Sequence, residues 1–182
     1  MKFIETKLKG AFVIEPEIVN DERGFFARIW CQKEFKDNGL DPNLAQISVA
    51  FNKKKGTVRG MHFQLSPHQE VKVVQCTKGS VYDVIIDLRP DSKTFKEWIS
   101  AELSAANYRL MYIPKGFAHG YQTLEDNTEV IYHMSEFFNP ELYRGVKWND
   151  PAFNIKWPIS DKIIISEKDK NHPDFRVSIS RF

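Results

Sequence analysis

Short apolar runs, broken by turn-forming residues, dominate the hydropathy pattern of the chain. Nine of them have the length of β-strands, and we expect them at residues 11–16, 46–51, 57–64, 71–76, 80–88, 95–103, 109–113, 119–124 and 128–134. The segments that separate them are rich in glycine, proline, asparagine and aspartate, as at residues 20–24, 89–92 and 114–116. This pattern is typical of an antiparallel β-sandwich or barrel.

Helical signals are few. Residues 32–38 read as a helix that ends at Gly39, which tolerates the left-handed conformation of a helix end. A second helical turn is expected near residues 166–170. With no repeat or linker in 182 residues, we expect one all-β domain spanning residues 1–182.

One pair of predicted strands carries opposite charges. If residues 71–76 and 80–88 form a hairpin through a turn at Gly79, Lys72 and Asp83 share one mostly apolar face. Charges on such a face are unfavourable unless they are paired. The two residues therefore form an ion pair, or a shift of one residue in register places both in solvent.

Composition and charge narrow the function classes. The formal net charge is only +2, which gives no reason to expect nucleic acid or a membrane surface as a partner. No run of about 18 apolar residues indicates a membrane span, and the first residues do not resemble a signal peptide. Cys31 and Cys76 lack metal-site spacing, so we expect reduced thiols and a cytoplasmic protein.

A metal site is one interpretation of the histidines. Residues 56–62 and 114–119 each end in histidine after a glycine, at His62 and His119, and Glu70 lies between them. These three residues could form a metal-binding triad. Gln64 weakens this interpretation, because it stands two residues after His62, where a second imidazole would be expected, and an amide is a poor ligand for transition metals.

Acid–base chemistry is a second interpretation of His62, and simple packing in the core is a third. A catalytic histidine needs a carboxylate that orients its ring, a second acid and a group that holds negative charge. The chain offers Asp83, Asp169, Tyr132 and Lys72 for these tasks, but they lie too far apart in sequence for spacing to assemble them.

Nine short motifs, in order along nearly the whole chain, resemble the dTDP-4-dehydrorhamnose 3,5-epimerase family. They are DERGFF (21–26), RGMHFQ (59–64), VYD (81–83), IDLR (86–89), LSAAN (103–107), IPKGFAHG (113–120), WNDP (148–151), WP (157–158) and SEKD (166–169). The resemblance implies a cupin-type jelly roll with a few short peripheral helices, a homodimer, and no required metal or cofactor. It also implies a nucleotide-sugar substrate with a ketone at C4 of the hexose, inverted at C3, C5 or both.

The resemblance assigns a role to each residue of the reaction. His62 matches the general base, Asp169 the carboxylate that orients it, and Tyr132 the acid that protonates the opposite face. Lys72 matches the cation near the C4 oxygen, where an enolate develops, and Asp83 would hold that lysine.

The same resemblance assigns the substrate-binding residues. Arg23 and Arg59 match contacts to the diphosphate, and Phe26 matches a ring that stacks near the base. Arg23 and Phe26 would reach the site of the partner subunit. The remaining substrate-side positions are Gln46, Ser48, His119, Phe138 and Lys168.

Three departures from the family pattern bear on specificity. Phe138 stands where many double epimerases have a second tyrosine, Arg28 stands where an acid is usual, and Ser48 replaces an asparagine. Three alternatives to a double epimerase therefore stay open. They are a C3-only epimerase acting on another nucleotide-linked 4-keto sugar, a metal-dependent cupin enzyme that uses His62, Glu70 and His119, and a non-catalytic binding module.

Overall fold

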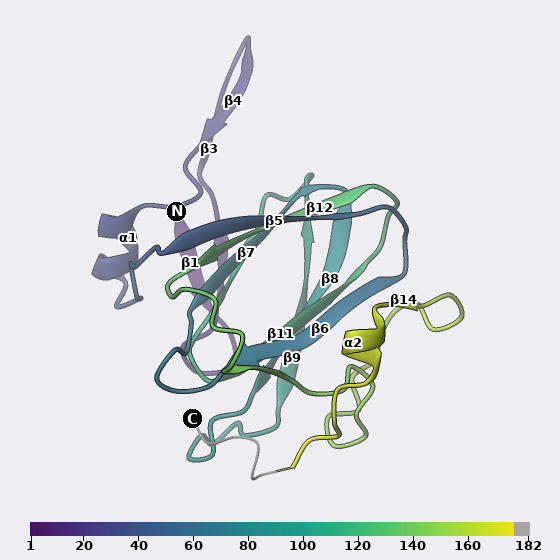
Figure 1. Cartoon of the computed structure of the whole chain (residues 1–182). Coiled ribbons are helices and arrows are strands. Elements are labelled where there is room, and N and C mark those ends of the chain that lie inside the picture. The colour runs from purple at the N-terminus through teal and green to yellow at the C-terminus, as the bar shows by residue number, and fades with distance from the viewer. Residues whose placement is uncertain (177–182) are drawn as a thin grey trace.

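Two six-stranded sheets face each other in the structure, a computed structural model that describes residues 1–176 (Figure 1). The first sheet contains, in spatial order, β1 (Lys2–Glu5), β2 (Phe12–Glu15), β10 (Leu110–Ile113), β7 (Lys72–Lys78), β12 (Thr128–Met134) and β5 (Gln46–Asn52). The second contains β13 (Tyr143–Gly145), β6 (Thr57–Gln64), β11 (Phe117–Thr123), β8 (Ser80–Asp87) and β9 (Trp98–Ser104), and β14 (Ile164–Ile165) joins it parallel to β6. Successive strands repeatedly change sheet, which is the predicted cupin-type jelly roll.

The main core lies between the two sheets. Val74 and Val130 of the first sheet pack with Ile85 and Tyr121 of the second, and all four side chains are fully buried. A second apolar cluster covers the outer face of the second sheet, where Phe153 and other residues of the C-terminal segment pack. Burial on both faces explains why several strands read as nearly continuous apolar runs rather than as alternating ones.

All nine predicted strands are present, with ends shifted by a few residues, but the predicted hairpin is wrong. Strands β7 and β8 belong to different sheets: β7 lies between β10 and β12, whereas β8 lies between β11 and β9. The turn between them is a corner, and Gly79 has a φ of 73° there. A Cβ atom at this position would lie only 2.5 Å from Thr128 Oγ1. Because glycine has no Cβ atom, the turn can pass close to Thr128 and lead the chain from one sheet into the other.

Both predicted helices are confirmed. Helix α1 (Gln32–Asp37) is followed by Asn38 and by Gly39, whose φ of 71° is the left-handed conformation expected of it. Helix α2 (Glu167–Lys170) begins after Ser166, whose side chain accepts a hydrogen bond from the Asp169 backbone N–H at 3.1 Å. Within residues 1–176, neither helix is long and apolar enough to cross a bilayer.

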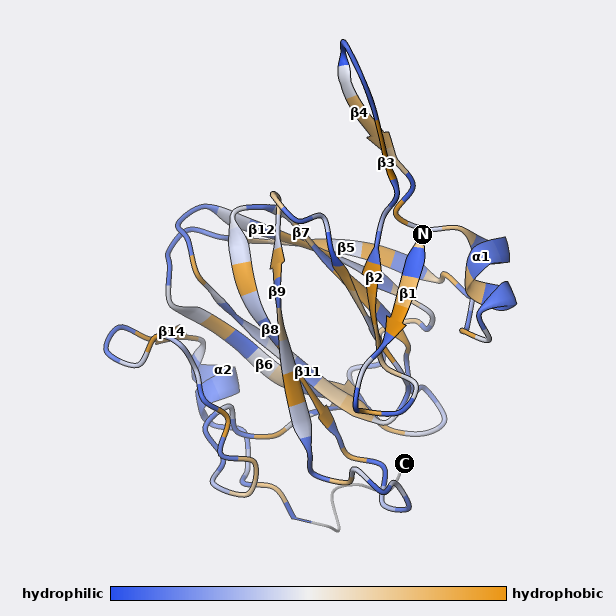
Figure 2. Cartoon of the chain, turned by 180° about the vertical axis from the view of Figure 1, so that it is seen from behind, coloured by the Kyte–Doolittle hydropathy of each residue, from blue (hydrophilic) through white to orange (hydrophobic). Residues whose placement is uncertain are grey.

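A hairpin of β3 (Ile18–Asp21) and β4 (Gly24–Ala27) extends away from the sandwich (Figure 1). The sequence pattern predicted the turn at residues 20–24 but not the two strands, because their side chains do not pack in the core. Val19 is 64% exposed and Phe26 is 71% exposed. Apolar residues nevertheless line both strands (Figure 2). Strands β1, β13 and β14 were also missed, since each is short and lies at or near a sheet edge.

Candidate active site

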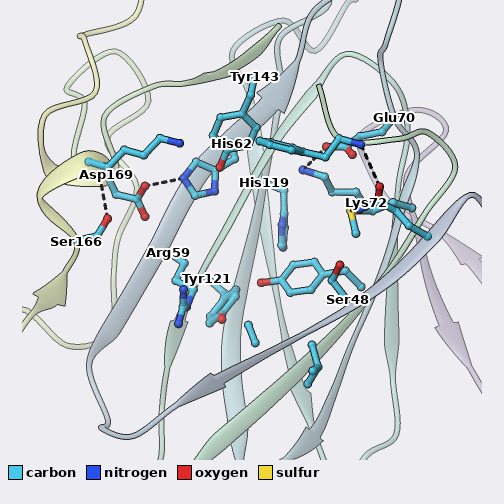
Figure 3. A pocket seen from close by; sticks show the side chains of 17 residues that line it. Ser48, Arg59, His62, Glu70, Lys72, His119, Tyr121, Tyr143, Ser166 and Asp169 are labelled. Atoms are coloured by element: carbon cyan, nitrogen blue, oxygen red, sulfur yellow. Dashed lines mark hydrogen bonds and ion pairs between the residues drawn. The ribbon is translucent and has the colours of Figure 1, made fainter. Parts of the chain in front are cut away.

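A cavity of about 620 Å3 opens between the two sheets (Figure 3). Most of the predicted site residues line it, namely Gln46, Ser48, Arg59, His62, Lys72, His119, Tyr132, Phe138, Lys168 and Asp169. They come from both sheets, from α2 and from the loop after β12. The fold thus brings together residues that sequence spacing could not.

His62 and Asp169 form a short polar contact in the cavity wall. The His62 Nε2 and Asp169 Oδ1 atoms lie 2.7 Å apart, although the residues are 107 positions apart in sequence. Strand β14 pairs with β6, and α2 follows directly, so the cap at Ser166 sets the carboxylate beside the strand that carries His62. The Gly60 backbone N–H also donates to Asp169 Oδ2, at 3.3 Å.

The charge states of this pair suit a base and its orienting carboxylate. Burial lowers the pKa of His62, and the positive charge of Lys72 adds to this, while Asp169 opposes it. Burial alone would raise the pKa of Asp169, but the adjacent imidazoles of His172 and His62 outweigh it, so that pKa is well below its ordinary value. At neutral pH the site therefore contains a neutral imidazole next to an ionised carboxylate.

Lys72 is held by a different acid from the one predicted. Its ammonium lies 2.9 Å from Glu70 Oε1, and these side chains are only 10% and 7% exposed. The predicted bond between Asp83 and Lys72 is therefore wrong, because it depended on the β7–β8 hairpin. Asp83 Oδ2 instead lies 2.7 Å from His119 Nε2, since β8 and β11 are neighbours in the second sheet.

Tyr132 lies on β12, in the sheet opposite to His62. Its ring meets the His119 ring edge-on at 6.0 Å, and the Tyr121 ring lies 6.5 Å away. Burial, followed by the influence of Tyr121, raises the pKa of Tyr132 well above that of an ordinary phenol. Tyr132 therefore keeps its proton across the physiological range and lines the cavity as a neutral phenol.

Polar groups continue along the cavity wall beyond this centre. Arg59 Nε donates a hydrogen bond to Asn52 Oδ1 at 2.8 Å, which fixes the guanidinium between β6 and the end of β5. The Lys168 ammonium lies 4.4 Å from the centre of the Tyr143 ring. Gln46 Oε1 accepts the backbone N–H of Phe138 at 3.0 Å and so fixes the loop after β12. Arg59 and Lys168 thus give the cavity wall two cations, which suit an anionic ligand.

Three predicted site residues do not line the cavity: Asp83 is buried behind His119, and the other two lie far from it. Arg23 and Phe26 are on the protruding β3–β4 hairpin, and both are strongly exposed. Arg23 Nη2 pairs with Asp21 across 2.6 Å, within the same turn.

The predicted metal triad of His62, Glu70 and His119 does not form. Glu70 is paired with Lys72 and His119 with Asp83, in the contacts described above. Among residues 1–176, the one group of three side chains with metal-ligating geometry is His62, Asp169 and His172. His172 had no sequence signal, since only the folding of the segment after α2 places it there.

Tyr143 was also missed by the sequence interpretation. Its ring lies 5.1 Å from the His62 ring because β13 pairs with β6, and it contacts Phe138 edge-on at 5.3 Å. Burial raises its pKa, and the negative charge of Asp169 adds to this. Tyr143 thus forms a protonated aromatic wall between His62 and Phe138.

Comparison with known proteins points to one family. The sequence model of the dTDP-4-dehydrorhamnose 3,5-epimerase family matches residues 5–177. The epimerase of that name from Methanothermobacter thermautotrophicus is 41% identical over 177 residues, covering 96% of this chain and 95% of the relative.

Solved structures agree with the sequence comparison. A Bacillus anthracis dTDP-4-dehydrorhamnose 3,5-epimerase with TDP and PPi bound has a TM-score of 0.92 and 41% identity, covering 96% of this chain and 99% of that one. A Legionella pneumophila 3,5-epimerase in complex with dTDP-4-keto-L-rhamnose has a TM-score of 0.90 and 33% identity, covering 95% and 92%.

Proposed function

This chain belongs to the dTDP-4-dehydrorhamnose 3,5-epimerase family, and from that membership we propose how its residues carry out the reaction. The protein is an isomerase that inverts C3, C5 or both in a nucleoside-diphosphate-linked 4-keto-6-deoxyhexose. For its native substrate we propose dTDP-4-keto-6-deoxyglucose. One observation supports the mechanism above all others: His62, paired with Asp169 on one sheet side, and Tyr132, on the opposite sheet, line the same cavity.

The ketone at C4 makes the protons on C3 and C5 acidic. His62 removes such a proton with its free ring nitrogen, and the C4 oxygen takes up the negative charge of an enolate. Asp169 accepts the hydrogen bond of the other nitrogen at 2.7 Å and stabilises the imidazolium that forms. Inversion requires that the new proton arrive from the opposite face of the sugar ring.

Tyr132 supplies that second proton. It comes from β12 of the first sheet, whereas His62 comes from β6 of the second, so the two groups approach a sugar between the sheets from opposite sides. The raised pKa of Tyr132, which burial causes, keeps the phenol protonated until the carbanion forms. His119, held by Asp83 at 2.7 Å, packs against Tyr132 and positions its ring.

Lys72 stabilises the enolate oxygen. A fixed cation beside a developing oxyanion lowers the barrier without reorganising during the reaction. The buried bond to Glu70 fixes the ammonium and compensates its charge in the free enzyme. Glu70 thus takes the supporting role that the sequence interpretation gave to Asp83.

The nucleotide end of the substrate binds toward Arg59 and Lys168. Guanidinium and ammonium groups bind diphosphate oxygens, and both side chains line the cavity with Gln46, Ser48 and Phe138. Phe138 is 53% exposed and offers a ring face rather than a hydroxyl group.

A homodimer completes each site. The outer face of β5 exposes Ile47, Val49 and Phe51 by 57%, 63% and 48%, an apolar row that a second copy of the chain would cover. The β3–β4 hairpin then extends into the partner's cavity, where Arg23 contacts the diphosphate and Phe26 stacks near the base. We also propose a cytoplasmic location, because Cys31 and Cys76 are free thiols, as in reducing compartments.

A single inversion at C3 is the second candidate. Phe138 favours it, since its ring packs on Tyr143 at the cavity wall and cannot donate the hydrogen bond that a tyrosine would give to the sugar.

Solvent exchange tests the proposed function. Incubation with dTDP-4-keto-6-deoxyglucose in deuterium oxide is expected to place deuterium at C3 and C5, read by nuclear magnetic resonance. Deuterium at C3 alone supports the single inversion. A lack of exchange with thymidine-, cytidine- and guanosine-linked ketosugars refutes the assignment, and full exchange by His62→Ala removes His62 from the role of base.

A further inference from the structure

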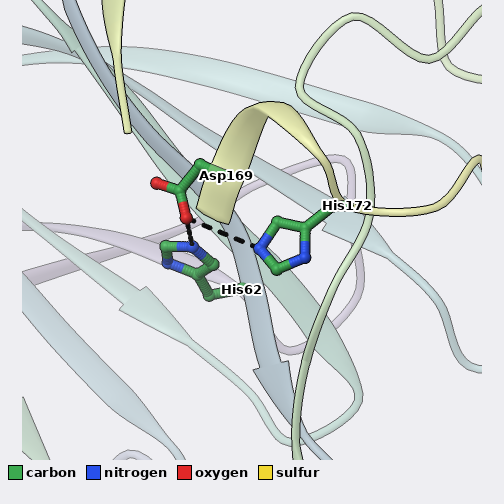
Figure 4. Close-up of side chains that lie close together, drawn as sticks. All are labelled: His62, Asp169 and His172. Atoms are coloured by element: carbon green, nitrogen blue, oxygen red, sulfur yellow. Dashed lines mark hydrogen bonds and ion pairs between the residues drawn. The ribbon is translucent and has the colours of Figure 1, made fainter. Parts of the chain in front are cut away.

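A buried imidazole that the proposed reaction does not use lies behind the catalytic pair. His172 follows α2, its side chain is 10% exposed, and its Nε2 atom lies 3.5 Å from Asp169 Oδ1 (Figure 4). This nitrogen makes no hydrogen bond to any of the described residues, and its contact to Asp169 is an ion-pair distance only. A buried polar atom without a partner requires an explanation.

His62, Asp169 and His172 together form a donor set for a metal ion. Two imidazoles and a carboxylate offer ligand atoms that all lie within 4.8 Å of one another. Bonds of about 2.0–2.2 Å in a tetrahedral zinc site place neighbouring ligand atoms about 3.4 Å apart. The 3.5 Å between His172 and Asp169 matches this spacing. The 2.7 Å between His62 and Asp169 must widen by about 0.7 Å to reach it, which a small side-chain rotation provides.

The surroundings leave room for the second imidazole. A Cβ atom on residue 145 would lie 2.4 Å from His172 Nε2, so Gly145 provides the space that the ring occupies. Gly145 is also the β13 partner of His62, and the two histidine rings lie 5.5 Å apart. The nearby charge of Lys72 is compensated by Glu70, which reduces its repulsion of a cation.

We propose that His62, Asp169 and His172 bind borderline transition-metal dications such as Zn2+, and that the bound ion inhibits the enzyme. Imidazole and carboxylate ligands suit Zn2+, Co2+, Ni2+ and Cu2+ much better than Mg2+. Binding displaces the proton shared by His62 and Asp169 to solvent, and a tetrahedral ion with these three ligands has one further position for water. The inhibitory effect rests on the proposed function: an ion on Nε2 of His62 removes the hydrogen bond to Asp169 and makes the other ring nitrogen a weaker base.

Metal titration of the exchange reaction tests the proposal. Chelator-treated protein without a histidine tag is assayed for solvent exchange at increasing Zn2+, with Mg2+ in parallel. Exchange is expected to fall at least tenfold at saturating Zn2+, to recover with a chelator, and to be unaffected by Mg2+. His172→Asn and His172→Ala are expected to raise the half-inhibiting Zn2+ concentration about 10- to 100-fold, each relative to its own metal-free rate.

A second histidine–carboxylate pair provides the matched control. His68 lies 3.7 Å from Glu136 in a more exposed position, and His68→Ala should leave the Zn2+ sensitivity unchanged. Equal inhibition of the wild type and His172→Asn overturns the site, as does loss of sensitivity in His68→Ala.

Direct binding separates this proposal from the proposed function. Calorimetry is expected to show one Zn2+ per chain, lost in both His172→Asn and His62→Ala. Binding with this pattern, but no exchange of any ketosugar, supports the metal site and refutes the epimerase mechanism. An active enzyme that binds no Zn2+ overturns the metal site alone.

Discussion

Replacing Asp169 by asparagine isolates the charge that stabilises the proposed base. The substitution keeps the size of the side chain and an oxygen that can accept the hydrogen bond of His62, which is 2.7 Å long in the wild type. Asp169 is only 8% exposed on its side chain, so water screens this interaction weakly. The imidazolium that forms on His62 in the transition state then faces a neutral amide.

The expected loss follows from the strength of that bond. A hydrogen bond to a charged group contributes about 1.5–3 kcal/mol. Since about 1.36 kcal/mol corresponds to a tenfold change in rate, kcat should fall about 10- to 150-fold. KM should change little, because the interaction strengthens when His62 becomes charged rather than when the substrate binds.

Steady-state kinetics of the epimerisation checks this expectation. Circular dichroism of each variant shows whether it is folded. Glu167→Gln is the matched control: it removes a carboxylate from the same helix, but one that is 81% exposed and 3.6 Å from Lys170. It should retain the wild-type rate. If Asp169→Asn is folded and its kcat is within twofold of that of Glu167→Gln, the charge of Asp169 has no role in the reaction.

Three further predictions concern stability and assembly. Glu70→Gln leaves the buried Lys72 ammonium unpaired and should lower the free energy of unfolding by about 3–5 kcal/mol, whereas adding Lys72→Met should recover part of this loss in denaturant titrations. The free energy of unfolding should fall as pH rises above the ordinary tyrosine pKa of 10.0, because burial raises the pKa of Tyr132 and its phenol ionises there only in the unfolded chain. If the denaturation midpoint of Tyr132→Phe falls between pH 9 and 11 as steeply as that of the wild type, this expectation is wrong. Arg23→Ala should raise KM for the nucleotide sugar while light scattering still shows a dimer, and an unchanged KM argues against its reaching the partner's cavity.

The strands could be predicted from the sequence because each carries its own signal. A run such as residues 57–64 has strand length and is bounded by turn residues, whatever its partners are. Helix α2 was predicted for the same reason, since Ser166 caps it locally. The roles of His62 and Asp169 came from the family resemblance, because no spacing rule joins residues 107 positions apart.

Strand partners could not be predicted in the same way. The turn at Gly79 suits a hairpin and a corner between sheets equally, so no local signal showed that Asp83 lies on the other sheet and pairs with His119 rather than with Lys72. His172 and Tyr143 were missed for a similar reason, as both are brought to His62 by the folding of the C-terminal third of the chain.

The distance in sequence between His62 and Asp169 also orders events during synthesis. The strand that carries the proposed base emerges from the ribosome more than a hundred residues before the helix that carries its carboxylate. The contact between His62 and Asp169 is therefore among the last available to the growing chain. A nascent or clipped polypeptide that lacks α2 has every strand of the first sheet but no oriented base. Epimerase activity therefore requires a chain that is intact through α2, and incomplete chains that lack α2 should not turn over the substrate.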